Sequence, residues 1–144
     1  MKDELFLVDT NILVYSLDKS EPEKQKSCSS LIEKCWMQEE SYAIALQNIS
    51  EFYVVVTKKI ENPLPTSIAR KIVKDIIDFN NWQVISYDEA SLITAIDMGI
   101  KYKIHYWDSL LCATMKQNGI NGIYTENVKD FDKVPWVTAI NPME

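Results

Sequence analysis

Short apolar runs alternate along this chain with longer amphipathic segments, and this alternation constrains the fold more than any other feature. A short continuous apolar run predicts a buried strand, whereas apolar residues spaced three and four apart predict a helix. Strands that alternate with helices form a mainly parallel sheet with helices on both faces. We therefore predict a three-layer α/β/α fold. The predicted strands are 5–9, 42–45, 82–86, 122–125 and 136–140, and the predicted helices are 12–15, 20–38, 46–59, 66–79, 88–99 and 107–118.

One of these segments, 46–59, admits two interpretations. Its apolar residues lie three and four positions apart, as on the buried face of a helix. The β-branched run 54–57 favours a strand instead, because β-branched side chains lose rotamer freedom in a helix. The helical spacing extends over the whole segment, and we predict a helix.

Two glycines mark expected helix ends. Gly99 and Gly119 each close a predicted helix. Glycine adopts a positive φ without steric cost, and this conformation is common just past a helix C-terminus. We expect both glycines to occupy that position.

The composition is that of a globular domain. With 144 residues, 47% of them hydrophobic, the chain can bury one substantial core, so we predict a single domain over 1–144. No apolar stretch approaches the roughly 20 residues of a membrane helix, and the first residues lack the layout of a signal peptide. Cys28, Cys35 and Cys112 are too scattered for a disulfide framework and fit buried thiols. We therefore predict a cytoplasmic protein.

Several acidic residues lie at the ends of predicted elements. Asp9 directly follows a buried strand, Glu51 lies on a helix, Asp108 begins another, and Asp130 and Asp132 follow a strand. In a parallel sheet, ligands gather beyond the carboxyl ends of the strands. Carboxylate oxygens are the ligands that Mg²⁺ and Mn²⁺ prefer, and such ions assist phosphoryl chemistry. The pattern predicts a metal-dependent enzyme that acts on phosphodiesters.

Each acid also has a structural explanation when it is considered alone. Asp9 and Asp108 could cap helices or favour a helix N-terminus, and Glu51 could be a solvated helix residue. Asp130 and Asp132 could be turn residues. Asp9 fits this alternative least, because its carboxylate leaves a buried strand, where an unpaired charge is costly.

Four segments, in their order along the chain, resemble the motifs of PIN-domain ribonucleases. The segments are 6–15 around Asp9, 48–52 around Glu51, 106–111 around Asp108, and 124–131, which ends in Asp130-Phe131. Their order and spacing most resemble the VapC-type toxins of toxin–antitoxin pairs. The resemblance implies a PIN fold and a metal-dependent endoribonuclease that hydrolyses RNA phosphodiesters, as the toxin of a type II pair.

The resemblance also implies roles for the matching residues. Asp9, Glu51 and Asp108 would be catalytic and would hold one or two Mg²⁺ or Mn²⁺ ions, directly or through water. The residues that would hydrogen-bond these carboxylates and orient them are Thr10, Asn11 and Ser109.

The fourth motif leaves two alternatives open. Many VapC-type proteins have Asp at the position of Asn127, and others have Asn there with Asp-Phe three residues later. This chain matches the second form, with Asp130 as the additional acid. Asn127 can supply a neutral oxygen, and Asp130 can supply the carboxylate. We predict both as metal ligands and Asp130 as a further catalytic residue.

The charge balance is unusual for a protein that binds nucleic acid. The net charge is −6, and Arg70 is the only arginine. Part of this charge would belong to the metal site, or a basic partner would cover an acidic face. The predicted RNA contacts are Lys101, Lys103 and Tyr106, which alternate cations with an aromatic ring. The resemblance further implies a cognate antitoxin and a homodimer.

Two other classes of function compete with this prediction. The chain could be a PIN-like module that binds RNA or protein through a degenerate metal site, which Asn127 and the scarcity of arginine favour. It could also be a metal-dependent phosphatase on a similar sheet. Aspartyl-phosphate enzymes of that kind usually carry an acid two residues after the nucleophile, where this chain has Asn11.

Overall fold

The computed structural model describes residues 4–144 and contains a five-stranded sheet with seven helices. The elements are β1 (Phe6–Val8), α1 (Thr10–Tyr15), α2 (Pro22–Trp36), β2 (Tyr42–Ala45), α3 (Leu46–Lys58), α4 (Thr66–Asp78), β3 (Trp82–Ile85), α5 (Glu89–Tyr102), α6 (Tyr106–Gln117), β4 (Gly122–Tyr124), α7 (Val128–Phe131) and β5 (Thr138–Ile140). Within the described range, no helix is both long and apolar enough to cross a membrane.

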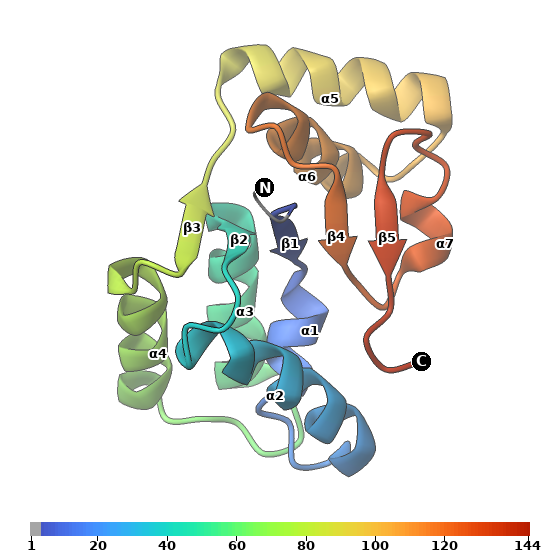
Figure 1. Ribbon diagram of the computed structural model, residues 1–144. Coiled ribbons are helices and arrows are strands. Elements are labelled where there is room, and N and C mark those ends of the chain that lie inside the picture. The colour runs from blue at the N-terminus through green and yellow to red at the C-terminus, as the bar shows by residue number, and fades with distance from the viewer. Residues whose placement is uncertain (1–3) are drawn as a thin grey trace.

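All strand pairs of the sheet are parallel, and the strand order is β3-β2-β1-β4-β5. The first strand is therefore central (Figure 1), with Phe6 opposite Tyr42 of β2 on one side and Gly122 of β4 on the other. The chain runs outward from β1 in one direction through β2 and β3, and later in the other through β4 and β5. The carboxyl ends of β1 and β4 thus flank the point where the strand order reverses, which is where parallel sheets bind ligands.

Helices cover both faces of the sheet, which confirms the predicted three-layer α/β/α fold. Leu7 of β1 packs in a cluster with residues of α5, α6 and α7, whereas its neighbour Val8 packs with residues of α1, α2, α3 and α4. Figure 1 shows these two groups of helices on opposite sides of the strands. Successive side chains of a strand point to opposite faces, so both residues are buried, each in a different layer.

The segment around the β-branched run is helical, as predicted. In α3 the residues Ile49, Phe52 and Val56 are buried three and four positions apart against the same layer. Burial of this apolar face outweighs the weak preference of β-branched residues for strands, because tertiary packing supplies most helical stability. Asp130 is also helical, in the short α7, where the sequence suggested a turn as one alternative.

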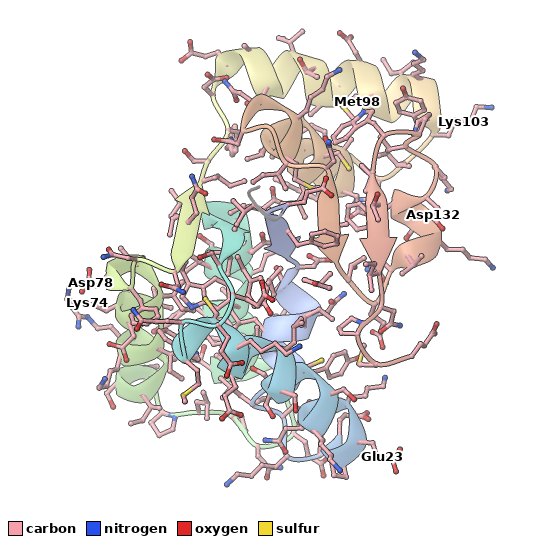
Figure 2. The ribbon with its side chains drawn as sticks, viewed as in Figure 1. Glu23, Lys74, Asp78, Met98, Lys103 and Asp132 are labelled. Atoms are coloured by element: carbon pink, nitrogen blue, oxygen red, sulfur yellow. The ribbon has the colours of Figure 1, made fainter. Side chains whose placement is uncertain are left out.

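The two glycines differ in outcome. Gly119 follows α6 with a φ of 70°, as predicted. The prediction for Gly99 was wrong: α5 continues to Tyr102, and Lys103, which Figure 2 labels, adopts the left-handed conformation with a φ of 56°. Gly99 instead lets α5 approach α6 closely, since a Cβ there would lie 3.3 Å from Oγ of Ser109.

The three cysteines are buried free thiols, as predicted. Cys28 and Cys35 lie on the inner face of α2, and Cys112 lies inside α6. Burial raises the pKa of Cys28 and Cys35 to about 11, so both remain protonated near neutral pH. They act as small apolar core residues.

Candidate functional site

A cleft of about 300 Å³ opens at the carboxyl end of β1. Its walls come from the start of α1, the middle of α3, the first turn of α6 and the loop after β4. The residues that line it are Asp9, Thr10, Asn11, Val14, Tyr15, Glu51, Val55, Asp108 and Asn127. The fold therefore brings together three of the four predicted catalytic acids, although they are far apart in sequence.

Asp9 is held at the base of the cleft by three donors. Its Oδ1 accepts the backbone N–H of Thr10 at 2.8 Å and the side-chain amide of Asn48 at 3.4 Å, and its Oδ2 accepts the hydroxyl of Thr125 at 2.8 Å. Asp9 is also the N-cap of α1. The structural explanation considered from the sequence, a helix cap, therefore applies to Asp9 together with its place in the cleft. A buried carboxylate with these contacts has a fixed orientation.

The surroundings of Asp9 oppose its negative charge. Burial is the main cause, and together with the charges of Asp108 and Glu51 it raises the pKa of Asp9 from 3.8 to about 6. The hydrogen bonds from Thr125 and Thr10 act in the opposite direction and only partly compensate. Ionised Asp9 therefore gains from any cation that enters the cleft.

Asp108 and Glu51 line the cleft from α6 and α3. Asp108 lies half-buried in the first turn of α6, and burial, followed by the charges of Asp130 and Glu51, raises its pKa, while His105 opposes the shift. Glu51 is exposed on α3, where Gln47 donates to its Oε1 at 3.4 Å. In the described part of the chain, no lysine or arginine forms an ion pair with Asp9, Glu51 or Asp108. Their charges are left to repel one another.

The donor set fits a hydrated hard cation rather than a closed cage of side chains. Among residues 4–144, no three His, Cys, Asp or Glu side chains lie close enough to enclose an ion together. The three carboxylates nevertheless line one cleft, and the charges of Asp108 and Glu51 both raise the pKa of Asp9. Mg²⁺ usually keeps several waters and takes only one or two carboxylates directly, so an open acidic cleft of this size suits it.

The three residues expected to orient the carboxylates have different positions. Thr10 donates its N–H to Asp9, and its hydroxyl accepts from Asn48 at 3.0 Å. Asn11 lines the cleft, and its Oδ1 accepts the N–H of Glu126 at 3.4 Å. Ser109 is fully buried, and its hydroxyl donates at 2.8 Å to the carbonyl of Tyr106 rather than to a carboxylate.

The two residues of the fourth motif are also separated. Asn127 lines the cleft, and its N–H donates to the hydroxyl of Thr125 at 3.0 Å. Asp130 is exposed on α7, outside the cleft lining, with Oδ1 3.9 Å from Nζ of Lys133. The charge of Asp130 still raises the pKa of Asp108, and its effect is larger than the effect of the Glu51 charge. Asp130 thus lies outside the cleft and acts on Asp108 through its charge.

The predicted RNA contacts lie around the turn between α5 and α6: Lys101 is in the last turn of α5, Lys103 follows that helix, and Tyr106 begins α6. Lys101 and Lys103 are exposed, with Nζ of Lys101 5.3 Å from the centre of the Tyr102 ring. Tyr106 is half-buried, and its ring packs edge-on against Trp107 at 5.1 Å. None of the three predicted residues lines the cleft, although the segment leads directly to Asp108.

Two residues that bind Asp9 were not singled out from the sequence. Asn48 and Thr125 are uncharged and almost fully buried, and both donate to the Asp9 carboxylate. A signal was present, because Thr125 directly follows an apolar strand, as Asp9 does, and Asn48 lies in the first turn of the helix after another strand. Buried polar side chains at strand ends need partners.

A basic side chain also reaches the cleft edge without contacting the acids at its base. Lys24 of α2 pairs with Glu126 at 3.1 Å and lies 4.7 Å from the centre of the Tyr15 ring. The hydroxyl of Tyr15 donates to Glu126 at 2.9 Å. These contacts connect α1 and α2 to the loop after β4, and the charge of Lys24 balances the charge of Glu126.

The fold is similar to several solved structures, among them a toxin–antitoxin complex. A toxin–antitoxin complex from Klebsiella pneumoniae is 20% identical, with a TM-score of 0.65 over 95% of this chain and 97% of that chain. FitAB bound to a DNA fragment is 17% identical, with a TM-score of 0.72 over 97% and 96% of the two chains. VapC20 from Mycobacterium tuberculosis, described as a sarcin–ricin loop cleaving toxin, is 13% identical, with a TM-score of 0.64 over 92% and 96%. At these identities the likeness is one of fold.

Comparison of the sequence with family models identifies the family of the chain. No curated protein matches it at the significance required. The family model of the PIN domain matches residues 6–137, and the chain therefore belongs to the PIN domain family.

Proposed function

We propose that this protein is a Mg²⁺- or Mn²⁺-dependent endoribonuclease and the toxin of a type II toxin–antitoxin pair. The observation that carries the proposal is the convergence of Asp9, Glu51 and Asp108 on one cleft, where no basic side chain of residues 4–144 is paired with them. Clustered carboxylates destabilise a fold unless a ligand uses them, so a decayed site would have little reason to keep all three.

The side chains that line the cleft have different roles. Asp9 presents a fixed carboxylate, because Thr125 and Thr10 hold both of its oxygens. Asp108 and Glu51 approach from the walls, and Asn127 adds a neutral oxygen donor. When bound, a divalent cation supplies an activated water and offsets the charge that develops on the phosphate.

RNA as the substrate rests on two supports. One solved structure of the same fold is described as a toxin that cleaves the sarcin–ricin loop. The segment with Lys101, Lys103 and Tyr106 offers cations and an aromatic ring at the start of the helix that carries Asp108. We propose that this segment contacts the RNA backbone and bases next to the cleft.

An antitoxin would bind beside the same cleft. A groove of about 330 Å³ on α3 is lined by Ser50, Glu51, Val54, Val55 and Lys59, and it shares Glu51 and Val55 with the acidic cleft. A peptide with an apolar residue in this groove and a basic residue over the carboxylates would cover the site. The net charge of −6 suits such a basic segment, and complexes with antitoxins are among the solved structures of this fold.

We further propose a homodimer through α5. Ile93, Ile96 and Ile100 are 59%, 43% and 74% exposed, and their spacing of three and four places them on one face of this helix. A solvent-exposed apolar row of this kind is characteristic of an interface. Sedimentation of wild-type protein and of Ile100→Lys tests this point, with a dimer expected for the first and a monomer for the second.

The test of the proposed activity is cleavage of varied RNAs by purified protein with Mn²⁺. We expect cleavage that EDTA abolishes, and Asp9→Asn or Asp108→Asn should reduce it by more than about 100-fold, since even groups that only orient metal ligands contribute 10–100-fold. Circular dichroism should show that both variants remain folded. Asp75→Asn, which removes a surface acid of α4 that pairs with Lys71, is the control.

Two results would count against the proposal. Cleavage of no RNA by the wild type would remove the toxin assignment. Mn²⁺ binding that does not depend on Asp9 would instead favour a PIN-like binding module with a degenerate site.

A further inference from the structure

Gln47 connects two of the cleft walls, although it does not line the cleft itself. Its side-chain Nε2 donates to Oε1 of Glu51 at 3.4 Å and to the backbone carbonyl of Trp107 at 3.1 Å. The contact to Glu51 spans one turn of α3, and the contact to Trp107 crosses to the first turn of α6. In the described part of the chain, the second contact is the one hydrogen bond between these two helices.

The orientation of the Gln47 amide follows from these acceptors. Both partners of Nε2 are oxygen atoms without a hydrogen to donate, so a flipped amide would set oxygen against oxygen. In the observed orientation, Oε1 of Gln47 is buried and has no hydrogen-bond partner among the described residues. The amide hydrogens thus stay between Glu51 and Trp107, although Oε1 gains no partner among the described residues. Each buried polar atom of this kind in a native structure calls for an explanation.

The two acceptors are important because of the residues to which they belong or are adjacent. Glu51 is exposed, and among residues 4–144 its carboxylate accepts a hydrogen bond from Gln47 alone. The carbonyl of Trp107 belongs to the residue directly before Asp108. One amide therefore restrains a carboxylate on α3 relative to the helix turn that presents the carboxylate on α6.

We propose that Gln47 is a positioning residue that holds Glu51 and Asp108 at the spacing a divalent cation requires. The inference deepens the proposed function and rests on its metal site. The donor hydrogens of Gln47 act on the ligands and not on the ion. Groups that orient metal ligands in this way contribute 10–100-fold to metal affinity in other proteins.

The test compares two glutamines that each donate to a carboxylate. Gln47→Met keeps the length of the side chain and removes its donor. Gln117→Met removes the same kind of bond far from the cleft, where Gln117 donates to Asp88 at 2.6 Å. In calorimetric titration with Mn²⁺, we expect Gln47→Met to bind about tenfold more weakly than wild type, at the lower end of the range for such groups. Gln117→Met should bind like wild type. Melting temperatures in EDTA show whether each variant is folded.

A spectroscopic measurement separates positioning from general stability. The electron paramagnetic resonance spectrum of bound Mn²⁺ reports the symmetry of its ligands. We expect the spectrum of Gln47→Met to resemble that of Glu51→Gln, and the spectrum of Gln117→Met to match wild type. If Gln47→Met fails to fold, Gln47→Asn tests the same contact, because the shorter amide cannot reach both acceptors.

The outcomes distinguish the metal site from the role of Gln47. A wild-type protein that binds no Mn²⁺ overturns the proposed metal site and this inference with it. A wild-type protein that binds Mn²⁺, with unchanged affinity and spectrum in Gln47→Met, overturns the role of Gln47 and leaves the metal site intact.

Discussion

The hydroxyl of Thr125 donates a 2.8 Å hydrogen bond to Oδ2 of Asp9, joining two residues that lie 116 positions apart in sequence. The parallel pairing of β1 with β4 makes this contact possible, since it aligns Val8 with Tyr124, the residues directly before the pair. The same hydroxyl accepts the N–H of Asn127 at 3.0 Å. Thr125 thus couples the carboxylate at the base of the cleft to the amide on its wall.

Removal of this hydroxyl tests the coupling. Thr125→Val leaves one oxygen of Asp9 without its donor, and loss of one partner from a buried polar pair costs about 1–3 kcal/mol. We expect a loss of unfolding free energy of that size, a further rise of the Asp9 pKa above about 6, and Mn²⁺ binding weakened by about 10–100-fold. Urea denaturation and calorimetry measure these effects.

Thr114→Val is the matched control for this change. Thr114 is also buried, but its hydroxyl donates to Leu110 of its own helix at 2.8 Å. This variant should lose stability without a change in Mn²⁺ affinity. If Thr125→Val and Thr114→Val bind Mn²⁺ with equal affinity, Thr125 contributes only to the stability of the fold.

Asp9 itself should destabilise the ion-free protein at neutral pH. Its pKa is about 6 in the folded protein against 3.8 ordinarily, so between these values the folded state binds more protons than the unfolded state. The free energy of unfolding therefore falls as pH rises from about 4 to about 6, by on the order of 3 kcal/mol. We expect Asp9→Asn in EDTA to melt at a higher temperature than wild type at pH 7.5, and the difference to shrink at pH 4.5.

Metal and a second aspartate provide the controls for Asp9. Mn²⁺ should raise the melting temperature of the wild type but not of Asp9→Asn, because a ligand stabilises only the state that binds it. Asp18 is a buried aspartate outside the cleft that accepts the N–H of Ser20 at 3.0 Å. Asp18→Asn should give no gain in stability at pH 7.5. A wild type more stable than Asp9→Asn in EDTA at that pH would refute the cost of the buried charge.

The order of elements was predictable because its signals are local. Apolar runs and helical spacing identified every strand and all helices but the short α7. The order of strands in the sheet depends on pairing between distant segments and was not predicted. Gly99 shows the same limit, since its role comes from contact with Ser109 on another helix rather than from its own backbone preference.

The site was predictable to a similar extent. Asp9, Glu51 and Asp108 were identified by their charge and by motifs that resemble those of PIN-domain ribonucleases, and they line one cleft. Their roles as metal ligands remain a proposal. Asn48 and Thr125 were missed because an uncharged side chain acquires its role only from its neighbours, which the sheet register sets. Composition and residue spacing do not predict such contacts.

The register between β1 and β4 can be tested at Gly122. A Cβ at this position would lie 2.6 Å from ring carbons of Phe6, the residue opposite it on β1. The Phe6 ring also packs against Tyr124 with centroids 4.8 Å apart, which limits its movement. We expect Gly122→Ala to lower the free energy of unfolding by about 1–3 kcal/mol, measured by urea denaturation, as overpacking does.

A smaller residue at Phe6 should relieve this clash. In a Phe6→Leu background, Gly122→Ala should cost much less, so that the two changes are strongly non-additive, as expected for residues in contact. Additive costs would mean that Phe6 and Gly122 do not face each other, and the aligned ends of β1 and β4 would be in doubt.

Two neighbouring acids allow a test of the fourth motif. Asp130 raises the pKa of Asp108 through its charge, whereas Asp132, labelled at the end of α7 in Figure 2, is not among the causes of that shift. Asp130→Asn should therefore lower the pKa of Asp108 in the ion-free protein, and Asp132→Asn should leave it unchanged, as followed by carboxyl carbon resonances in NMR. Since an acid with a lower pKa is ionised over a wider range, Asp130→Asn should also extend Mn²⁺ binding to lower pH, unless Asp130 itself is a ligand. In that case affinity falls at every pH, and the direction of the change decides whether Asp130 binds the ion or only acts on Asp108 from outside the cleft.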